Sequence, residues 1–292
     1  MKGVRMNKET RNKSRLQNPL LSDEYRAEME ARFRSLPLSD DFMFAQVMMQ
    51  KEICKAFLEN LLGKKIAKLR YVQRQKHEAD SYGWHGVRLD IYLADDKGTK
   101  YNIEMQRGRL GDIPHRSRYY QAVMDRKSLR KGADYADLPD SYVIFVCDYD
   151  LFAGKKGGGK AKYELTSCFN GDKDLDYADG RRLIVLNSKY KTANVDESIE
   201  DFLKAIGGEE NEMKTEFGND IRAALDKIRE DDEIYDLYMV TDLKLRDREK
   251  DAEKRGREEG RAETAHNMKL EGLPLDLISR ITGLEISAIE AL

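Results

Sequence analysis

The chain has 292 residues, of which 36% are charged, and a mean hydropathy of −0.73. Its net charge of −2 excludes a protein that is basic throughout, so any surface for nucleic acid must be a local patch. No stretch approaches the ~18 apolar residues of a membrane span. The three cysteines, Cys54, Cys147 and Cys168, are far apart, which argues against a disulfide framework or a zinc site and favours the reducing cytoplasm.

The first 36 residues are predicted to be a basic, largely disordered arm. Residues 1–21 contain six lysines and arginines, one glutamate and few apolar side chains. A segment of this composition cannot bury enough apolar surface to fold by itself. A solvated tail explains the arm, and a dedicated DNA-binding arm is the alternative.

Residues 37–194 are predicted to form a domain in which helices alternate with strands. Its first helical segment, 40–62, can be capped by Ser39 or Asp40 and ends at Gly63. The further elements, in chain order, are a strand over 66–74, a hairpin over 88–106, a helix over 115–131 and strands over 142–147, 163–169 and 182–189. Strands interleaved with helices predict an α/β fold with a mixed central sheet.

The hairpin is the most informative of these elements because its turn fixes its register. Residues 95–98 suit a type I turn with Gly98 in the left-handed conformation, which places Asp90 opposite Glu104. Side chains that alternate along each strand then form one apolar and one polar face. Facing carboxylates repel each other, and a divalent cation with oxygen ligands would remove that cost. An ordinary half-exposed strand pair shows the same alternation and is the alternative.

The order of these acidic residues also resembles a known motif. Asp90, thirteen further residues and then Glu104-Met105-Gln106 resemble the D…(D/E)-x-K core of the PD-(D/E)XK nuclease superfamily. The motif is most similar to the branch of PD-(D/E)XK family transposases, or recombination-promoting nucleases, in which Gln often replaces the Lys. Four further segments resemble other elements of that branch and follow the same order, namely residues 39–44, 116–120, 132–135 and 142–147. The resemblance spans about residues 37–190 and implies a restriction-endonuclease-like α/β/α sandwich.

The resemblance implies a metal-dependent DNA endonuclease linked to recombination or mobile elements, with RNA left open as a substrate. It implies that Mg²⁺ or Mn²⁺ is held by Asp90, by Glu104 and by the backbone carbonyl of Met105, and that Glu104 also orients the attacking water. Gln106 would stand at the catalytic lysine position, with hydrogen-bonding capacity but without a charge.

Three more residues are candidates for the same site. In the superfamily an acidic residue on the first helix can join the metal site, which implies a role for Asp41, although helix capping explains Asp41 equally well. Arg116 and Arg118 are candidate phosphate contacts, with solvated arginines as the alternative. The neighbouring Tyr119 is expected to lie in the core.

Two rival functions belong to other classes. A catalytically weak or silent nucleic-acid-binding protein would keep the fold and lose metal affinity, and the presence of both Asp90 and Glu104 argues against it. An oligomeric interaction protein would instead use the polar helices that follow the domain, and its hairpin face would be merely solvated.

Beyond residue 194 the chain is predicted to be helical and very polar. A helical extension over 195–250 precedes a charged helix and a small helical unit over 251–292, and neither is expected to contribute catalytic groups. The turn at 279–283 resembles a helix-turn-helix, yet the segment after it has two Glu and no Lys or Arg, which favours a packing role. Residues 273–292 are too few for a core of their own, so they are expected to pack on another protomer or partner. These C-terminal helices are the candidate surface for a homo-oligomer.

Overall fold

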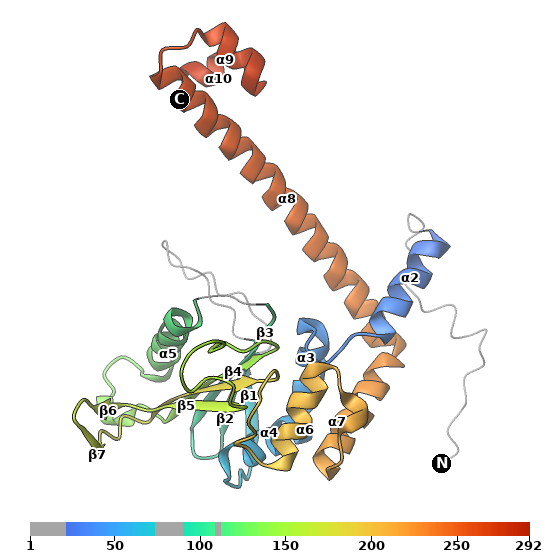
Figure 1. Cartoon of the computed structure of the whole chain (residues 1–292), viewed down its shortest axis with the longest axis vertical. Helices are drawn as coiled ribbons and strands as arrows, with labels where there is room; N and C mark the ends of the chain where they lie inside the picture. The colour runs from blue at the N-terminus through green and yellow to red at the C-terminus, as the bar shows by residue number, and fades with distance from the viewer. Residues whose placement is uncertain (1–21, 74–89, 109–111) are drawn as a thin grey trace. The chain divides into compact units, whose positions relative to one another are not determined.

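The chain forms two compact units in the computed structural model, Asp23–Asp231 and Asp232–Leu292 (Figure 1). The structure describes residues 22–73, 90–108 and 112–292. The predicted basic arm over 1–21 and the start of the predicted hairpin, 88–89, lie outside these ranges. Within them, no helix is both long enough and apolar enough to cross a membrane.

A six-stranded mixed sheet forms the centre of the first unit, as predicted. Its strands, in spatial order, are β1 (Leu69–Gln73), β2 (Ile91–Asp95), β3 (Lys100–Gln106), β4 (Ser141–Cys147), β8 (Arg181–Asn187) and β5 (Lys162–Leu165). β4 pairs in parallel with both β3 and β8, and the other pairs are antiparallel. The predicted strand over 163–169 divides into β5 and β6 (Cys168–Phe169), and β6 pairs with β7 (Asp172–Asp176) outside the main sheet.

The hairpin of β2 and β3 has the predicted register. Ile91 pairs with Ile103, which sets the preceding residue, Asp90, opposite Glu104. The turn is closed by the backbone N–H of Gly98, which donates to the carbonyl of Asp95 at 3.2 Å, and Gly98 has the left-handed φ of 90° that the turn requires.

Helices cover both faces of this sheet (Figure 1). α5 (Ile113–Ser128) packs on the face that carries Tyr92, Val143 and Phe145, with Tyr120 and Met124 buried beneath it. The other side is covered by α3 (Asp41–Met48), α4 (Lys51–Leu62), α6 (Glu197–Gly207) and α7 (Glu216–Arg229). The predicted helical segment 40–62 is therefore two helices, and Gly63 ends the second one with a φ of 63°.

The N-terminal arm gives way to a helix earlier than predicted. The expected disorder up to residue 36 does not hold for α2 (Asp23–Arg34), which buries Met29 and Phe33. Leu36 and Leu38, which follow this helix, are also buried. Apolar residues at 29, 33, 36 and 38 are too few to stand out as a pattern within such a charged sequence.

Helices α6 and α7 belong to the first unit rather than to an extension after residue 194. α6 buries Phe202 and Ile206, and α7 buries Ile221 and Leu225. The ring of Phe202 lies 4.4 Å from that of Phe57 on α4, measured between centroids. Each helix is therefore amphipathic, and its overall polarity comes from the outer face alone.

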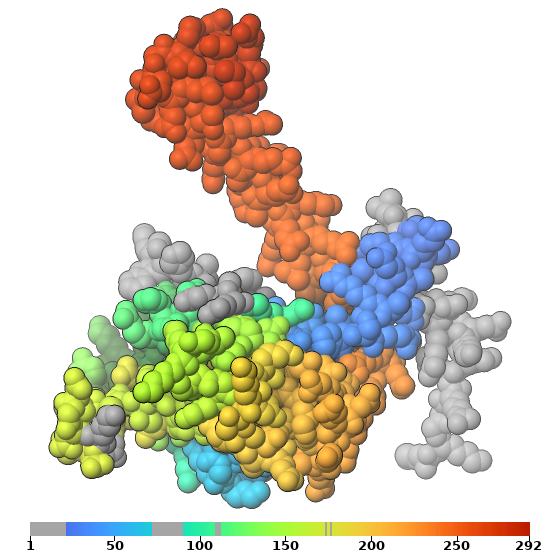
Figure 2. Space-filling view, viewed as in Figure 1, coloured from blue at the N-terminus to red at the C-terminus, as the bar shows by residue number. Residues whose placement is uncertain are grey.

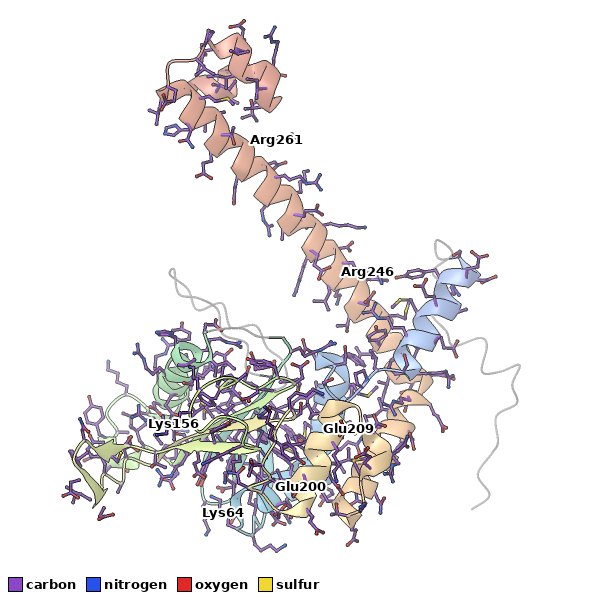
Figure 3. All side chains as sticks on the ribbon, viewed as in Figure 1. Lys64, Lys156, Glu200, Glu209, Arg246 and Arg261 are labelled. Atoms are coloured by element: carbon purple, nitrogen blue, oxygen red, sulfur yellow. The ribbon has the colours of Figure 1, made fainter. Side chains whose placement is uncertain are left out.

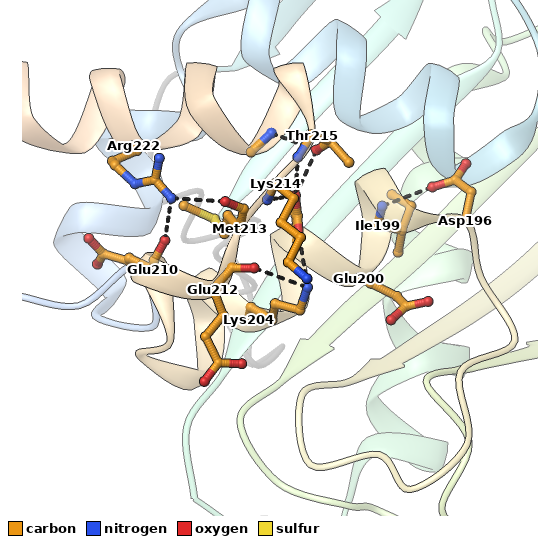
Figure 4. A network of polar contacts seen from close by, with 12 residues as sticks. Asp196, Ile199, Glu200, Lys204, Glu210, Glu212, Met213, Lys214, Thr215 and Arg222 are labelled. Atoms are coloured by element: carbon orange, nitrogen blue, oxygen red, sulfur yellow. Dashed lines mark hydrogen bonds and ion pairs between the residues drawn. The ribbon is translucent and has the colours of Figure 1, made fainter.

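A buried carboxylate connects α6 to the segment before α7. Asp201 is 1% exposed, and its Oδ2 accepts hydrogen bonds from the backbone N–H groups of Lys214 and Thr215, each at 2.7 Å. Its Oδ1 accepts from Lys204 Nζ at 2.9 Å. Figure 4 shows the donors Lys204, Lys214 and Thr215 within this network. Burial by itself would raise the pKa of Asp201, but these donors favour the charged form and lower the pKa to about 2.

The second unit consists of a long helix with two short ones folded against its end. α8 (Asp232–Leu270), α9 (Leu275–Thr282) and α10 (Ile286–Glu290) each contribute one residue to a buried cluster of Ala265, Ile278 and Ile289. Figure 2 shows the two short helices and the end of α8 as one continuous block. Residues 273–292 therefore do not lack a core within the chain, because the end of α8 supplies its missing side, and packing on another protomer or partner stays a prediction.

Candidate metal and active site

Asp90 and Glu104 are linked by reciprocal contacts between side chain and backbone. The backbone N–H of Asp90 donates to Glu104 Oε1 at 3.2 Å. In return, the N–H of Met105 donates to Asp90 Oδ2 at 3.3 Å. The two carboxylates therefore meet where β2 begins and β3 nears its end, on the same face of the sheet, as the hairpin register predicts.

The two carboxylates have different surroundings. Glu104 is 2% exposed, whereas Asp90 is partly exposed and forms the accessible side of the pair. Burial and, to a smaller extent, the nearby charge of Asp90 together raise the pKa of Glu104 to about 8. Arg116 opposes this shift without cancelling it. Without a cation the pair is thus arranged to hold one proton near neutral pH.

The polar face of the hairpin is not solvated. Tyr92, Asn102, Glu104 and Gln106 are all at most 5% exposed, because α5 covers this face. An ordinary solvated strand pair is therefore excluded. Buried polar groups normally need partners, and a carboxylate pair without one is costly.

Asn102 is the exception among these buried polar residues. It is fully buried, and its amide lies close enough to Glu104 to favour the ionised carboxyl. Neither its nitrogen nor its oxygen makes a hydrogen bond of normal geometry within the described part of the chain. An unsatisfied amide beside a buried carboxyl is consistent with a site that binds water or an ion.

Gln106 is held by the first turn of α5. Arg116 Nη1 donates to Gln106 Oε1 at 2.5 Å, and Arg116 Nη2 donates to the hydroxyl of Tyr120 at 2.7 Å. The same Nη2 lies 3.8 Å from Glu104 Oε2. Gln106 Nε2 donates in turn to the carbonyl of Met105 at 2.7 Å. The guanidinium therefore places a positive charge beside the position at which the motif has lysine.

The start of α3 lies near the end of β3. Asp40 caps this helix by accepting from the N–H groups of Phe42 and Met43, and its Oδ2 lies 3.3 Å from Arg107 Nη1. Asp41 follows in the first turn of α3 and is exposed. The contact of Asp40 with the residue after Gln106 brings this acidic segment to the same end of the sheet as Asp90 and Glu104.

The other predicted residues divide as follows. Arg118 is exposed on α5 and contributes no contact to the carboxylate pair. Tyr119 is partly buried and packs against the core beneath α5, as expected. Tyr120 and Asn102 also belong to the candidate site, although neither residue is among those predicted for it from the sequence. The spacing of Arg116 and Tyr120, four residues apart on one helix face, is the signal that identifies Tyr120.

These oxygen ligands fit a hard cation that takes only a few of its ligands from the protein. Two carboxylates and the Met105 carbonyl are oxygen ligands of the kind that Mg²⁺ and Mn²⁺ prefer. Within the described ranges, no group of three or more His, Cys, Asp or Glu side chains gathers in a metal-binding arrangement. Mg²⁺ usually retains several waters and needs only one or two carboxylates from the protein, so the smaller set is sufficient.

A comparison with family models gives a match for this chain. The family model described as PD-(D/E)XK nuclease family transposase matches residues 39–252, which include both carboxylates and extend through α6 and α7. Searches of curated proteins and of solved structures found no match.

Proposed function

The chain belongs to the PD-(D/E)XK nuclease family transposases, and on that premise we propose that it is a metal-dependent phosphodiesterase that cleaves DNA during recombination or movement of a mobile element. The observation that carries the proposal is the pair formed by the buried Glu104 and the partly exposed Asp90, in which each carboxyl group accepts a hydrogen bond from a backbone N–H at or beside the other residue.

Asp90, Glu104 and the Met105 carbonyl are the groups proposed to hold Mg²⁺ or Mn²⁺. When bound, the cation supplies charge neutralisation for the phosphate and a more acidic water. Asp90, which is partly exposed, is suited to face both cation and substrate. Glu104 is proposed to orient the attacking water. Its raised pKa applies to the metal-free pair, because a bound cation favours the ionised carboxyl.

Arg116 is proposed to supply the charge that Gln106 lacks. The guanidinium contacts Gln106 at 2.5 Å and lies 3.8 Å from Glu104, so it can stabilise negative charge that develops on the phosphate. It is buried to three quarters of its side chain and fixed by Tyr120, which makes its position well defined. Its proposed contact with the substrate is therefore at the reacting phosphate rather than along the DNA backbone.

Asp41 and Arg118 are proposed to act at the edges of this site. Asp41 is exposed at the start of α3, near the end of β3, where it can add a carboxylate to the site once DNA and cation are present. Arg118 is exposed on α5, two residues after Arg116, where it can contact a neighbouring phosphate.

The test is cleavage of duplex DNA by the purified full-length chain. Mg²⁺ or Mn²⁺ should support cleavage and EDTA should stop it, whereas Ca²⁺ should bind without supporting turnover. Asp90→Ala and Glu104→Ala should each abolish cleavage and keep the far-UV circular dichroism of the wild type. Robust cleavage in EDTA, or wild-type rates in both variants, would contradict the proposal.

A catalytically silent DNA-binding protein on the same fold is the second candidate. The uncharged Gln106 at the lysine position favours it, since that residue is expected to affect rate more than metal binding. Binding of DNA without cleavage under any divalent cation would support this candidate. Metal-dependent cleavage that is lost in Asp90→Ala would exclude it.

A further inference from the structure

An open groove lies on the C-terminal unit, between α8 and the end of α9. Its volume is about 530 Å³. Arg257 and Arg261 of α8 line one side, and Arg280 of α9 lines the other, with no acidic residue in the lining. Figure 3 shows Arg261 on the C-terminal half of α8. Positive side chains therefore gather in this groove, although residues 249–263 as a whole mix both signs of charge.

These guanidinium groups are available to a ligand. In the part of the chain that the structure describes, Arg261 and Arg280 take part in no side-chain hydrogen bond or ion pair. Arg257 pairs with Glu253 at 2.8 Å, and both side chains are largely exposed. A solvent-exposed ion pair between residues four apart on a helix contributes little to stability, so a more highly charged ligand can displace Glu253 from Arg257.

Two glycines of α8, Gly256 and Gly260, also line the groove. Glycine destabilises a helix interior relative to alanine. Neither glycine has a positive φ, and an added Cβ at either position would have no neighbour within 4 Å. Packing within the described part of the unit therefore does not require a glycine at either position. The missing side chains instead keep the groove open to the close approach of a ligand.

We propose that this groove binds the phosphate groups of a nucleic-acid backbone, apart from the carboxylate site on the sheet. Arginine presents a planar set of N–H donors that matches phosphate oxygens, and three such groups around one groove match successive phosphates better than a single small anion. The C-terminal end of α9 contributes a partial negative charge near Arg280, which three full positive charges outweigh. The groove holds DNA and performs no chemistry. The inference rests on the proposed function only in taking nucleic acid as the ligand.

The experiment measures binding of a fluorescently labelled DNA duplex to the full-length chain by anisotropy, in EDTA so that no cleavage occurs. The groove variant is Arg257→Gln with Arg261→Gln and Arg280→Gln. Its matched control is Lys244→Gln with Arg248→Gln and Arg255→Gln, which removes the same charge from α8. At 100° per residue, these three side chains project from the opposite face of the helix.

The groove variant should bind DNA roughly tenfold or more weakly than the control at moderate salt. Its plot of log affinity against log salt should be shallower by about 2 to 3 units, since each phosphate contact contributes about 0.9. Gly260→Leu, which fills the groove without changing charge, should weaken binding as well. Circular dichroism and sedimentation of each variant show whether the fold and the oligomeric state are unchanged.

Equal DNA affinity of the groove and control variants would overturn the proposal. So would an altered oligomeric state with unchanged DNA affinity, which would mean that the glycine face binds a second copy of the chain. Because the assay needs no turnover, a chain that binds DNA through the groove but never cleaves it would refute the proposed function and leave this inference standing.

Discussion

Two groups of charged side chains, one in each unit, have opposite surroundings. In the sheet unit, Glu104 and Asp201 are 2% and 1% exposed, and each carboxylate accepts a hydrogen bond from a backbone N–H group. In the C-terminal unit, Arg257 and Arg261 are exposed beside an open groove. Charge in the first unit therefore determines geometry and protonation, whereas charge in the second is available to a ligand. Substitutions in each unit should therefore have different consequences.

Removal of the buried carboxylate of Asp201 should cause the largest loss of stability at a fixed pH. Asp201→Ala should lower the free energy of unfolding by about 3 kcal/mol, because it leaves the N–H groups of Lys214 and Thr215 and the charge of Lys204 without their acceptor. Chemical denaturation of the wild type and the variant at neutral pH measures this loss of stability. The control Glu197→Ala, an exposed acid on the same helix, should change stability by a few tenths of a kcal/mol. Similar losses in both variants would mean that burial of Asp201 has no energetic consequence.

Removal of Arg116 tests whether it supplies the charge missing from Gln106. Arg116→Ala should lower the cleavage rate by about 10- to 100-fold, and Gln106→Lys added to that variant should restore part of it by moving the charge to the neighbouring side chain. Single-turnover cleavage at saturating protein measures both. Arg126→Ala, at the other end of α5, is the control. A wild-type rate in Arg116→Ala would show that the charge is not needed.

The raised pKa of Glu104 predicts how stability depends on pH without a cation. Between the ordinary pKa of 4.5 and the folded value of about 8, the folded chain holds a proton that the unfolded chain has lost. Stability should therefore fall as pH rises through this window, by at most about 1.4 kcal/mol per pH unit, and level off above about pH 8. Glu104→Gln should remove this contribution. Denaturation curves across pH measure it, and the same slope in both proteins would contradict the assignment.

Substitution of the groove glycines should have the smallest effect. Gly256→Ala and Gly260→Ala should each stabilise α8 by about 0.5 to 1 kcal/mol, because the added methyl group has open space and alanine favours the helix. The thermal unfolding of full-length variants measures it. A destabilised variant would indicate a contact of these glycines that the isolated chain does not show.

The hairpin could be predicted from the sequence because its turn is local. Gly98 and the alternation on either side of it determine the register, and the register alone places Asp90 opposite Glu104. The mixed sheet followed from the order of its strands and helices. Each of these inferences depends on neighbours along the chain.

What the sequence did not predict depends on contacts between distant segments. Burial of Asn102 and Glu104 follows from the position of α5 over the hairpin, and the contact of Arg116 with Gln106 joins that helix to β3. The inclusion of α6 in the first unit follows from the packing of Phe202 on Phe57. A periodic pattern shows that a helix is amphipathic, but it does not show which surface the apolar face meets.

Cation binding tests the central claim, that Asp90 and Glu104 form a metal site, most directly. Calorimetric titration of Mn²⁺ into the full-length chain should show binding that Asp90→Asn and Glu104→Gln each abolish. Asp96→Asn, which changes an exposed acid in the turn of the same hairpin, should leave it intact. Binding in the wild type should also strengthen as pH rises toward 8, because the cation must displace a proton from Glu104. Undiminished Mn²⁺ binding by the Asp90 and Glu104 variants would contradict the account.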